Sequence, residues 1–270
     1  MRTAAKQLRF VLAQWAVNLA SAMAYRTSFL LQASFMFLND AFWLFIWWVL
    51  LNNFPNIAGW RMGEILLMYG LSAGGWGLMV IFAANATRLS QIIAEGQLDY
   101  YLALPKNVLV HTLISRTQFD AVGDLTFGIV ALAIGCALTG SSLPLAIFFM
   151  FTAALILAGF EVIVGSLAFF VGRSQEFSEQ IGMSAVTFSM YPGGIFKGFA
   201  KFLVFFVIPA GFITYLPVET LRAVGTSNTN GLRGALVVLA AAVVIWVIAV
   251  TVFYAGLRRY ESGNQIGLRE

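Results

Sequence analysis

The stretch LPLAIFFMFTAALILAGFEVIVGSLAFFV, residues 143–171, decides the fold class of this chain. Glu161 is the one charged residue in it. A helix needs about 20 mainly apolar residues to cross the roughly 30 Å hydrocarbon core of a bilayer. We therefore expect this stretch to span a membrane.

The whole chain has the same character. Of its 270 residues, 60% are hydrophobic and 10% are charged, whereas soluble domains carry about 25% charged residues. One cysteine, Cys136, and one histidine, His111, leave no intramolecular disulfide and no Cys/His metal cluster to be expected. The net charge of +4 does not indicate a nucleic-acid partner, because the basic residues gather at the ends of apolar runs, as orientation signals do.

The apolar runs predict an all-α integral membrane protein with six transmembrane helices, organised as a single domain over residues 1–270. The predicted spans are residues 27–51, 64–85, 120–140, 143–171, 180–196 and 235–257. Residues 198–224 hold a shorter apolar run with Pro209 inside it, which favours a re-entrant or interfacial hairpin before the last span, expected on the outer side. Lys197 and Lys201, one helical turn apart before that run, are expected to anchor it at the outer headgroups or to attract an anionic substrate.

Residues 1–26 are predicted to form an amphipathic helix along the cytoplasmic membrane surface. Leu12, Trp15 and Leu19 recur at helical spacing opposite Gln14 and Asn18. A signal peptide is the alternative, because basic residues that include Arg9 precede an apolar run, but the two polar side chains interrupt that run.

Charge indicates the orientation of the six spans. With the short run treated as re-entrant, both termini lie on one side with eleven basic residues, against five on the other, which favours cytoplasmic termini. The inner set is Arg2, Lys6, Arg9, Arg26, Arg88, Lys106, Arg116, Arg173, Arg258, Arg259 and Arg269, and the outer set is Arg61, Lys197, Lys201, Arg222 and Arg233.

Ionisable residues inside spans are costly, so each is a candidate for function. Arg116, Asp120 and Asp124 follow at i, i+4 and i+8, which predicts that they share a helix face and pair along it, or reach the headgroups. For Asp40 and Glu161, structural polarity in the interior and a role along a conduit both stay open.

Catalytic and ATP-binding motifs are missing. No glycine is followed directly by lysine, so the phosphate-binding loop is absent, and no HExxH motif occurs. The chain is therefore predicted not to be an enzyme. Gly70, Gly74 and Gly77 form a small-residue face, for which packing within the chain is favoured over a dimer interface.

The predicted loop between the second and third spans, residues 86–107, contains IIAEGQLDYYLALPKN. A short helix with Leu89, Ile92 and Ile93 on one side is expected to stop at Gly96. Taken alone, the segment is an amphipathic loop lying on a surface.

In context this loop resembles the cytoplasmic loop between the second and third spans of type-2 ABC-exporter permeases. Those permeases commonly carry the signature E-G-x-L-D-x-x-L-x-x-P, which is matched here by Glu95, Gly96, Leu98, Asp99, Leu102 and Pro105. The likeness extends to the surface helix, the six spans, the YPGGIF and VIPAGFITYLPVETL segments as an outer hairpin, and the RRYESG tail. It is strongest to the compact branch without a large extracellular domain.

The resemblance implies a permease of the bacterial cytoplasmic membrane, in contact with lipid, that works with two copies of a separate ATPase and with a second permease, either the same chain or a different one. ATP and magnesium would bind the ATPase, and this chain would bind no cofactor. Glu95 and Asp99 are then expected to be polar contacts to the ATPase, with Leu98 and Leu102 as apolar anchors. Two alternatives stay open: a proton-coupled secondary transporter that uses Asp120, Asp124 or Glu161, and a membrane scaffold or intramembrane enzyme. The transported substrate is not determined.

Overall fold

The protein is nearly all helical in the computed structural model, which describes residues 2–54, 57, 59–172, 175–224 and 229–260. The strand-type pairing within those residues is one isolated bridge between Ile57 and Trp60. Two basic residues of the charge argument, Arg173 and Arg269, lie outside the described residues, as does the second half of the RRYESG segment.

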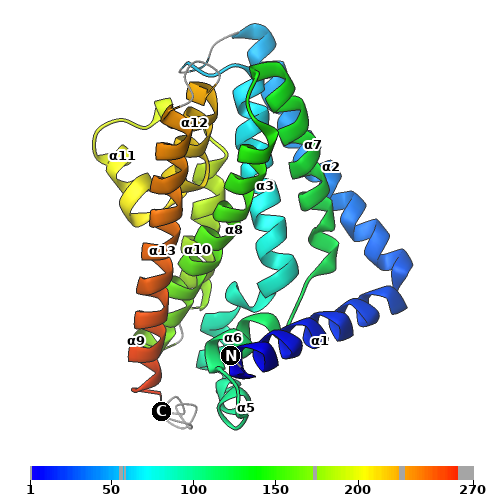
Figure 1. The fold of residues 1–270 in the computed structure, drawn as a ribbon, viewed down its shortest axis with the longest axis vertical. Coiled ribbons are helices and arrows are strands. Elements are labelled where there is room, and N and C mark those ends of the chain that lie inside the picture. The colour runs from blue at the N-terminus through cyan, green and yellow to red at the C-terminus, as the bar shows by residue number, and fades with distance from the viewer. Residues whose placement is uncertain (1, 55–56, 58, 173–174, 225–228, 261–270) are drawn as a thin grey trace.

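Within the described part of the chain, five helices are long and apolar enough to cross a membrane, and they stand side by side in Figure 1. The predicted runs 27–51, 64–85, 120–140, 143–171 and 235–257 each fall on one of them. The helices are α2 (Arg26–Asn53), α3 (Met62–Ala83), α7 (Val122–Thr139), α8 (Leu143–Ser166) continued by α9 (Ala168–Val171), and α13 (Thr229–Leu257).

The span predicted at residues 180–196 is not one helix. Helix α10 (Gln175–Ser189) has 15 residues and is followed by a separate turn at Gly193–Ile195. The break has a local cause, because Pro192 lacks a backbone N–H and disfavours the helical conformation in the residue before it. This helix is shorter than the five span candidates, so the prediction of six full spans is supported for five.

The region around Pro209 is a sharply bent pair of helical arms. The first arm is α11 (Phe199–Phe202) with a π-helical turn at Leu203–Val207, and the second is a π-helical turn at Gly211–Tyr215 with α12 (Leu216–Val224). The arms are inclined by 82°, and counted as one broken span they would bring the number of spans to six. Both lie towards the end of the molecule away from α1 (Figure 1).

The two lysines before this bend are not arranged as predicted. Gly198, with φ of +54°, separates Lys197 from the start of α11. Lys201 lies inside α11, so the two side chains do not occupy one helical turn. Both are exposed.

Helix α3 forms the centre of the bundle, and 89% of its apolar stretch is buried inside the protein. Glycines let α7 approach it closely: a Cβ at Gly128 would lie 2.5 Å from Cα of Gly74, and one at Gly70 would lie 2.7 Å from Cγ of Leu132. A Cβ at Gly77 would lie 2.8 Å from the backbone nitrogen of Leu125. The prediction that this glycine face packs within the chain is confirmed.

Buried polar contacts join α2 and α10 to this centre. The Trp47 indole on α2 donates to the Tyr69 hydroxyl on α3 over 2.9 Å. The hydroxyls of Ser72 on α3 and Ser189 on α10 share a hydrogen bond of 2.7 Å. Such bonds replace the water that is absent from a bilayer core.

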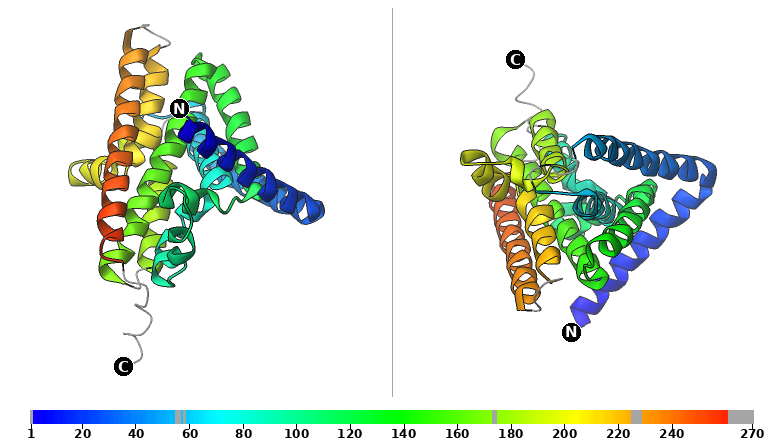
Figure 2. Two further views of the ribbon diagram at one scale, coloured as in Figure 1. Left: turned by 60° about the horizontal axis from the view of Figure 1, so that its bottom comes forward. Right: turned by 90° about the horizontal axis from the view of Figure 1, so that it is seen from above.

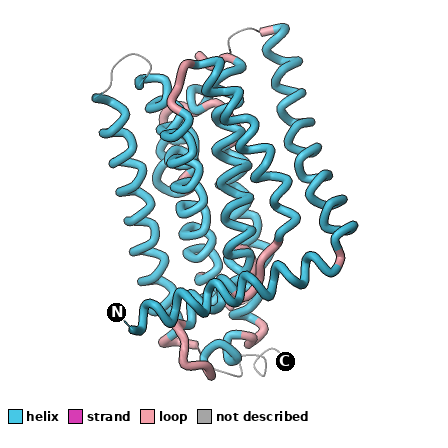
Figure 3. The backbone as a smooth tube through the Cα atoms, turned by 45° about the vertical axis from the view of Figure 1, so that its right-hand side comes forward, coloured by secondary structure: helices cyan, strands magenta, loops and turns pink. Residues whose placement is uncertain are grey.

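Helix α1 (Arg2–Ala24) crosses the ends of the upright helices (Figure 1, Figure 3) and meets α2 at an elbow at Tyr25. Seen from above, α1 and α2 enclose an open angle (Figure 2). Asn18 faces the chain and its side-chain amide donates to the Ser115 carbonyl, whereas Leu12 and Leu19 are exposed. Asn18 on the polar side therefore contacts the protein itself, as do the aromatic side chains of Phe10 and Trp15, whereas Leu12 and Leu19 are open to the surroundings.

Replacing Gly128 with valine should separate α7 from α3, because the new side chain would meet the Gly74 backbone. Overpacking of this kind costs about 1–3 kcal/mol, so we expect a lower Tm in detergent, measured by fluorescence-detected size exclusion after heating. Ala133→Val adds bulk on the exposed side of α7 and should leave the Tm unchanged. The same Tm for Gly128→Val and the wild type would contradict this packing.

Candidate functional site

The loop after α3 is built from three short helices at the α1 end of the molecule (Figure 1). They are α4 (Leu89–Ala94), α5 (Leu98–Leu102) and α6 (Val108–Ile114). Gly96 has φ of +73°, a left-handed conformation that side chains disfavour, and it ends α4 as predicted. The chain therefore turns sharply at Gly96 and presents α5 beyond the spans.

Burial divides the predicted contact residues of this loop into two groups. Glu95, Asp99, Leu102 and Pro105 are exposed, but Leu98 is fully buried in a cluster with Leu89, Ile92 and Leu109 among others. Leu98 therefore holds the loop together and is not available to a partner, which corrects its predicted role as an anchor.

Tyr100 is the contact candidate that sequence reasoning missed. Its side chain is 66% exposed on α5. Two adjacent tyrosines in a short polar loop could have indicated it, because consecutive residues of a helix point in different directions. Tyr101 accordingly turns inward.

An aromatic cluster joins α1, α5 and α6, and we call Phe10, Tyr101, Lys106 and His111 the His111 cluster. The His111 ring meets Phe10 at 4.8 Å and Tyr101 at 5.1 Å between centroids, both edge-on. The Lys106 ammonium lies 4.6 Å from the centre of the Phe10 ring, a cation–π distance. Burial, and secondly Lys106, lower the pKa of His111 below its usual value, which favours the neutral imidazole.

Further contacts tie this end of the chain to the spans. The Trp15 indole on α1 donates to the Phe82 carbonyl on α3 over 3.2 Å, and the Asn85 amide donates to the Thr112 carbonyl over 2.8 Å. The backbone N–H of Gln118 bonds to the carbonyl of Val80. The loop, α1 and α3 are thus mechanically connected.

The last described residue of the chain also contacts the loop. The Tyr260 hydroxyl lies 3.9 Å from the position of a Cβ on Gly96. Burial, together with the Asp99 side chain, raises the pKa of Tyr260 to about 12. The segment that follows α13 therefore covers the turn between α4 and α5.

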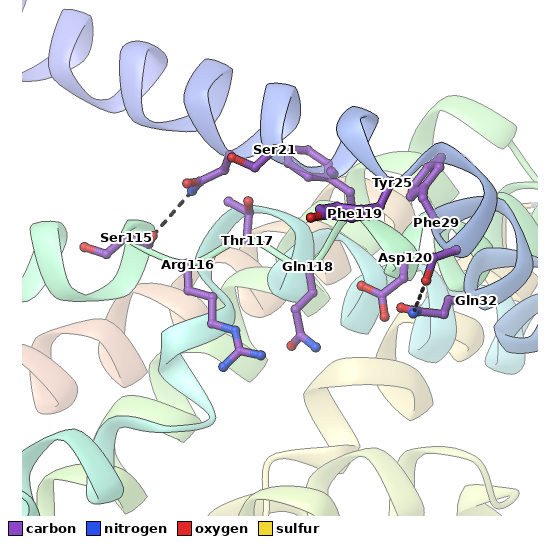
Figure 4. Close-up of a pocket in the computed structure, with 13 residues that line it drawn as sticks. Ser21, Tyr25, Phe29, Gln32, Ser115, Arg116, Thr117, Gln118, Phe119 and Asp120 are labelled. Carbon is purple, nitrogen blue, oxygen red and sulfur yellow. Dashed lines mark hydrogen bonds between the residues drawn. The ribbon is translucent and has the colours of Figure 1, made fainter.

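A cavity of about 580 Å³ lies beneath the elbow between α1 and α2 and is lined by residues 115–120 (Figure 4). Arg116 and Asp120 both line it, but Arg116 precedes the short turn Phe119–Ala121 and lies outside α7. Arg116, Asp120 and Asp124 therefore do not share one helix, which corrects the prediction of a charged face. Among the described residues the ion pair is Arg222 with Glu64, at 3.4 Å.

The buried acids lie in two places. Asp40 on α2 and Asp124 on α7 line one pocket between α2, α3, α7 and α10. Glu161 on α8 packs against Gly182 of α10, and its electrostatic neighbour is Glu179. Among the described residues no group of three or more His, Cys, Asp or Glu is arranged to hold a metal ion.

Comparison with known proteins agrees with this architecture. A protein-family model described as ABC-2 family transporter protein matches residues 37–264. The chain belongs to this ABC-2 transporter family. The resemblance to type-2 ABC permeases is thereby confirmed, and the family role makes this protein the membrane component of an ABC transporter, a permease that works with an ABC ATPase and is not itself catalytic. No curated protein and no solved structure matches it.

In this ABC-2 permease, Leu98→Ala should destabilise the fold by about 2–5 kcal/mol, because it leaves a cavity under the loop. Leu102→Ala removes an exposed side chain and should change stability by no more than about 0.5 kcal/mol. Thermal unfolding in detergent measures both. A larger loss of stability for Leu102→Ala than for Leu98→Ala would mean that Leu102, and not Leu98, holds the loop together.

The His111 cluster makes the stability of the permease depend on pH. Because burial lowers the pKa of His111 in the folded chain, the unfolded chain binds a proton more readily below about pH 6.5, and the folded state loses stability there. We expect the drop in Tm between pH 7.5 and pH 5.5 to be smaller in His111→Phe, which keeps an aromatic ring without a titrating group. An identical drop in both proteins would exclude this contribution.

Proposed function

We propose that this ABC-2 permease is an export permease that forms the translocation path and couples to a separate ATPase through residues 86–107. The observation that carries the proposal is the exposed side of α5 and its flanks, where Glu95, Asp99, Tyr100, Leu102 and Pro105 are accessible at one end of the molecule. Two carboxylates beside an exposed aromatic ring suit a docking site, since aromatic residues often dominate binding at interfaces.

The coupling path runs from α5 through the His111 cluster. A push on α5 would reach α1 through Phe10 and α6 through His111, and Asn85 carries the contact on to the end of α3. Binding energy at the ATPase would then bias the bundle between inward-open and outward-open states. The working unit has two ATPases, which bind ATP and magnesium, and a second permease, the same or different.

The same proposal orients the chain in a bacterial cytoplasmic membrane with both termini inside. Helix α1 would lie along the inner surface, since Leu12 and Leu19 are exposed towards the surroundings. The bent pair at Pro209 would be a re-entrant hairpin on the outer side, because its two arms lie away from α1. Lys197 and Lys201, both exposed, would then meet outer headgroups.

A proton-coupled secondary transporter is the second candidate, and it would use buried carboxyl groups as a relay. The observation in its favour is the burial of Asp40, Asp124 and Glu161. It requires transport without an ATPase, whereas the ABC-2 family works with one. We therefore favour the ATP-driven permease.

The double charge reversal Glu95→Lys with Asp99→Lys should weaken ATPase binding at least about tenfold, which corresponds to about 1.4 kcal/mol. Like charges would then face each other across the interface. The measurement is recovery of the ATPase in a mild-detergent pull-down from native membranes, together with its hydrolysis rate.

Two matched variants control for charge and position. Glu95→Asp with Asp99→Glu keeps both charges, and Glu219→Lys reverses an exposed charge on α12 at the other end of the molecule. Both should recover the ATPase as the wild type does. Normal recovery and coupled hydrolysis in the double reversal would reject this docking site.

A further inference from the structure

The pocket between α2, α3, α7 and α10 is the most unusual polar feature within the spans. Its volume is about 380 Å³, and Asp40 and Asp124 line it together with Asn39, Trp76, Met183 and Met190. Asp40 is 6% exposed and Asp124 is 8% exposed. Two acidic side chains thus face one small pocket with a mainly apolar wall.

Neither carboxyl group has a cationic partner in the described part of the chain, where the ion pair lies elsewhere, between Arg222 and Glu64. Oδ2 of Asp40 is buried and lacks a hydrogen-bond partner. The charged group that acts on Asp40 is Asp124, another acid. Buried polar groups normally have partners, because leaving one without any is costly. The residues that line this pocket include no lysine or arginine that could be that partner.

Close helix packing holds the two acids together. Gly123 faces the backbone carbonyl of Ala33, which brings α7 against α2. A Cβ at Gly77 would lie 3.2 Å from the Asp124 Cβ, so the glycine leaves room for Asp124 beside α3. This close backbone packing therefore places both carboxyl groups at the same pocket.

The pocket wall selects among cations. Hard metal ions require many oxygen ligands, about six to eight for calcium, and the described residues provide no group of three acidic, histidine or cysteine ligands. The Trp76 ring can instead face a cation, and the flexible thioethers of Met183 and Met190 adapt to irregular apolar shapes. These groups suit a bulky organic cation.

We propose that this pocket binds an organic cation with an apolar body, held by Asp40 and Asp124, and that such cations are the substrate class of the transporter. The substrate assignment rests on the proposed export function, whereas binding in the pocket can be measured independently of it.

The test is equilibrium dialysis of radiolabelled tetraphenylphosphonium against the full-length permease, purified with its ATPase in detergent, with protein-free micelles as background. Tetraphenylborate is the matched probe, since it has the same shape and the opposite charge. We expect saturable binding of the phosphonium and none of the borate. Asp40→Asn and Asp124→Asn should each raise the Kd at least about tenfold, whereas Glu161→Gln, a buried acid outside the pocket lining, should not change it.

Three results would overturn the proposal: no saturable phosphonium binding by the wild type, equal binding of the borate, or an unchanged Kd in Asp40→Asn. The comparison of the two probes uses only the wild type, so it decides the question even if a variant fails to fold. ATPase recovery in the same preparation separates the two proposals. If the complex retains its ATPase but does not bind the phosphonium, the proposed cation site is rejected and the ATPase docking site is not. If the permease binds the phosphonium but never retains an ATPase, the proposed ATPase docking site is rejected and the cation site is not.

Discussion

The close approach of α3 and α7 at their glycines is the constraint on which the rest of this permease depends. Apolar side chains gain little by leaving lipid for a protein interior, so helices in a bilayer associate chiefly through packing contacts and hydrogen bonds. Gly74 meets Gly128 backbone to backbone, and Gly77 admits the first turn of α7. This contact makes α3 the buried centre of the bundle and brings Asp124 into the pocket that Asp40 also lines.

The α1 end of the molecule follows a different physical rule, because short helices there need side-chain contacts to hold their positions. Isolated helices of five to seven residues are unstable in water. Leu98 supplies the buried side chain that holds α5, and His111 supplies the surface on which Phe10 and Tyr101 pack. A loop stabilised in this way can transmit a displacement to α1 and α3 as a unit, which is what coupling to an ATPase requires.

Much of the architecture could be predicted from local sequence, but the direction of several side chains could not. Five apolar runs, the stop at Gly96 and a break in the region of Pro209 depend on chain chemistry within a few residues. The prediction that Arg116, Asp120 and Asp124 share a helix face was wrong, because a turn at Phe119–Ala121 interrupts the helix between them. Spacing alone also could not reveal that Leu98 points inward while Leu102 is exposed, since both fit the same apolar stripe.

The sequence by itself determined that this chain is a helical membrane protein, that it contains no phosphate-binding loop and that its second loop carries the signature of type-2 ABC permeases. These properties are encoded in composition and in short runs of residues, which are independent of how the helices meet. Only the tertiary structure decided that Asp40 and Asp124, far apart in the chain, line one pocket, and that Phe10 reaches His111. The first pairing depends on which helix faces the glycines allow into contact, and the second on how α1 packs against the loop after α3. No local pattern records either choice.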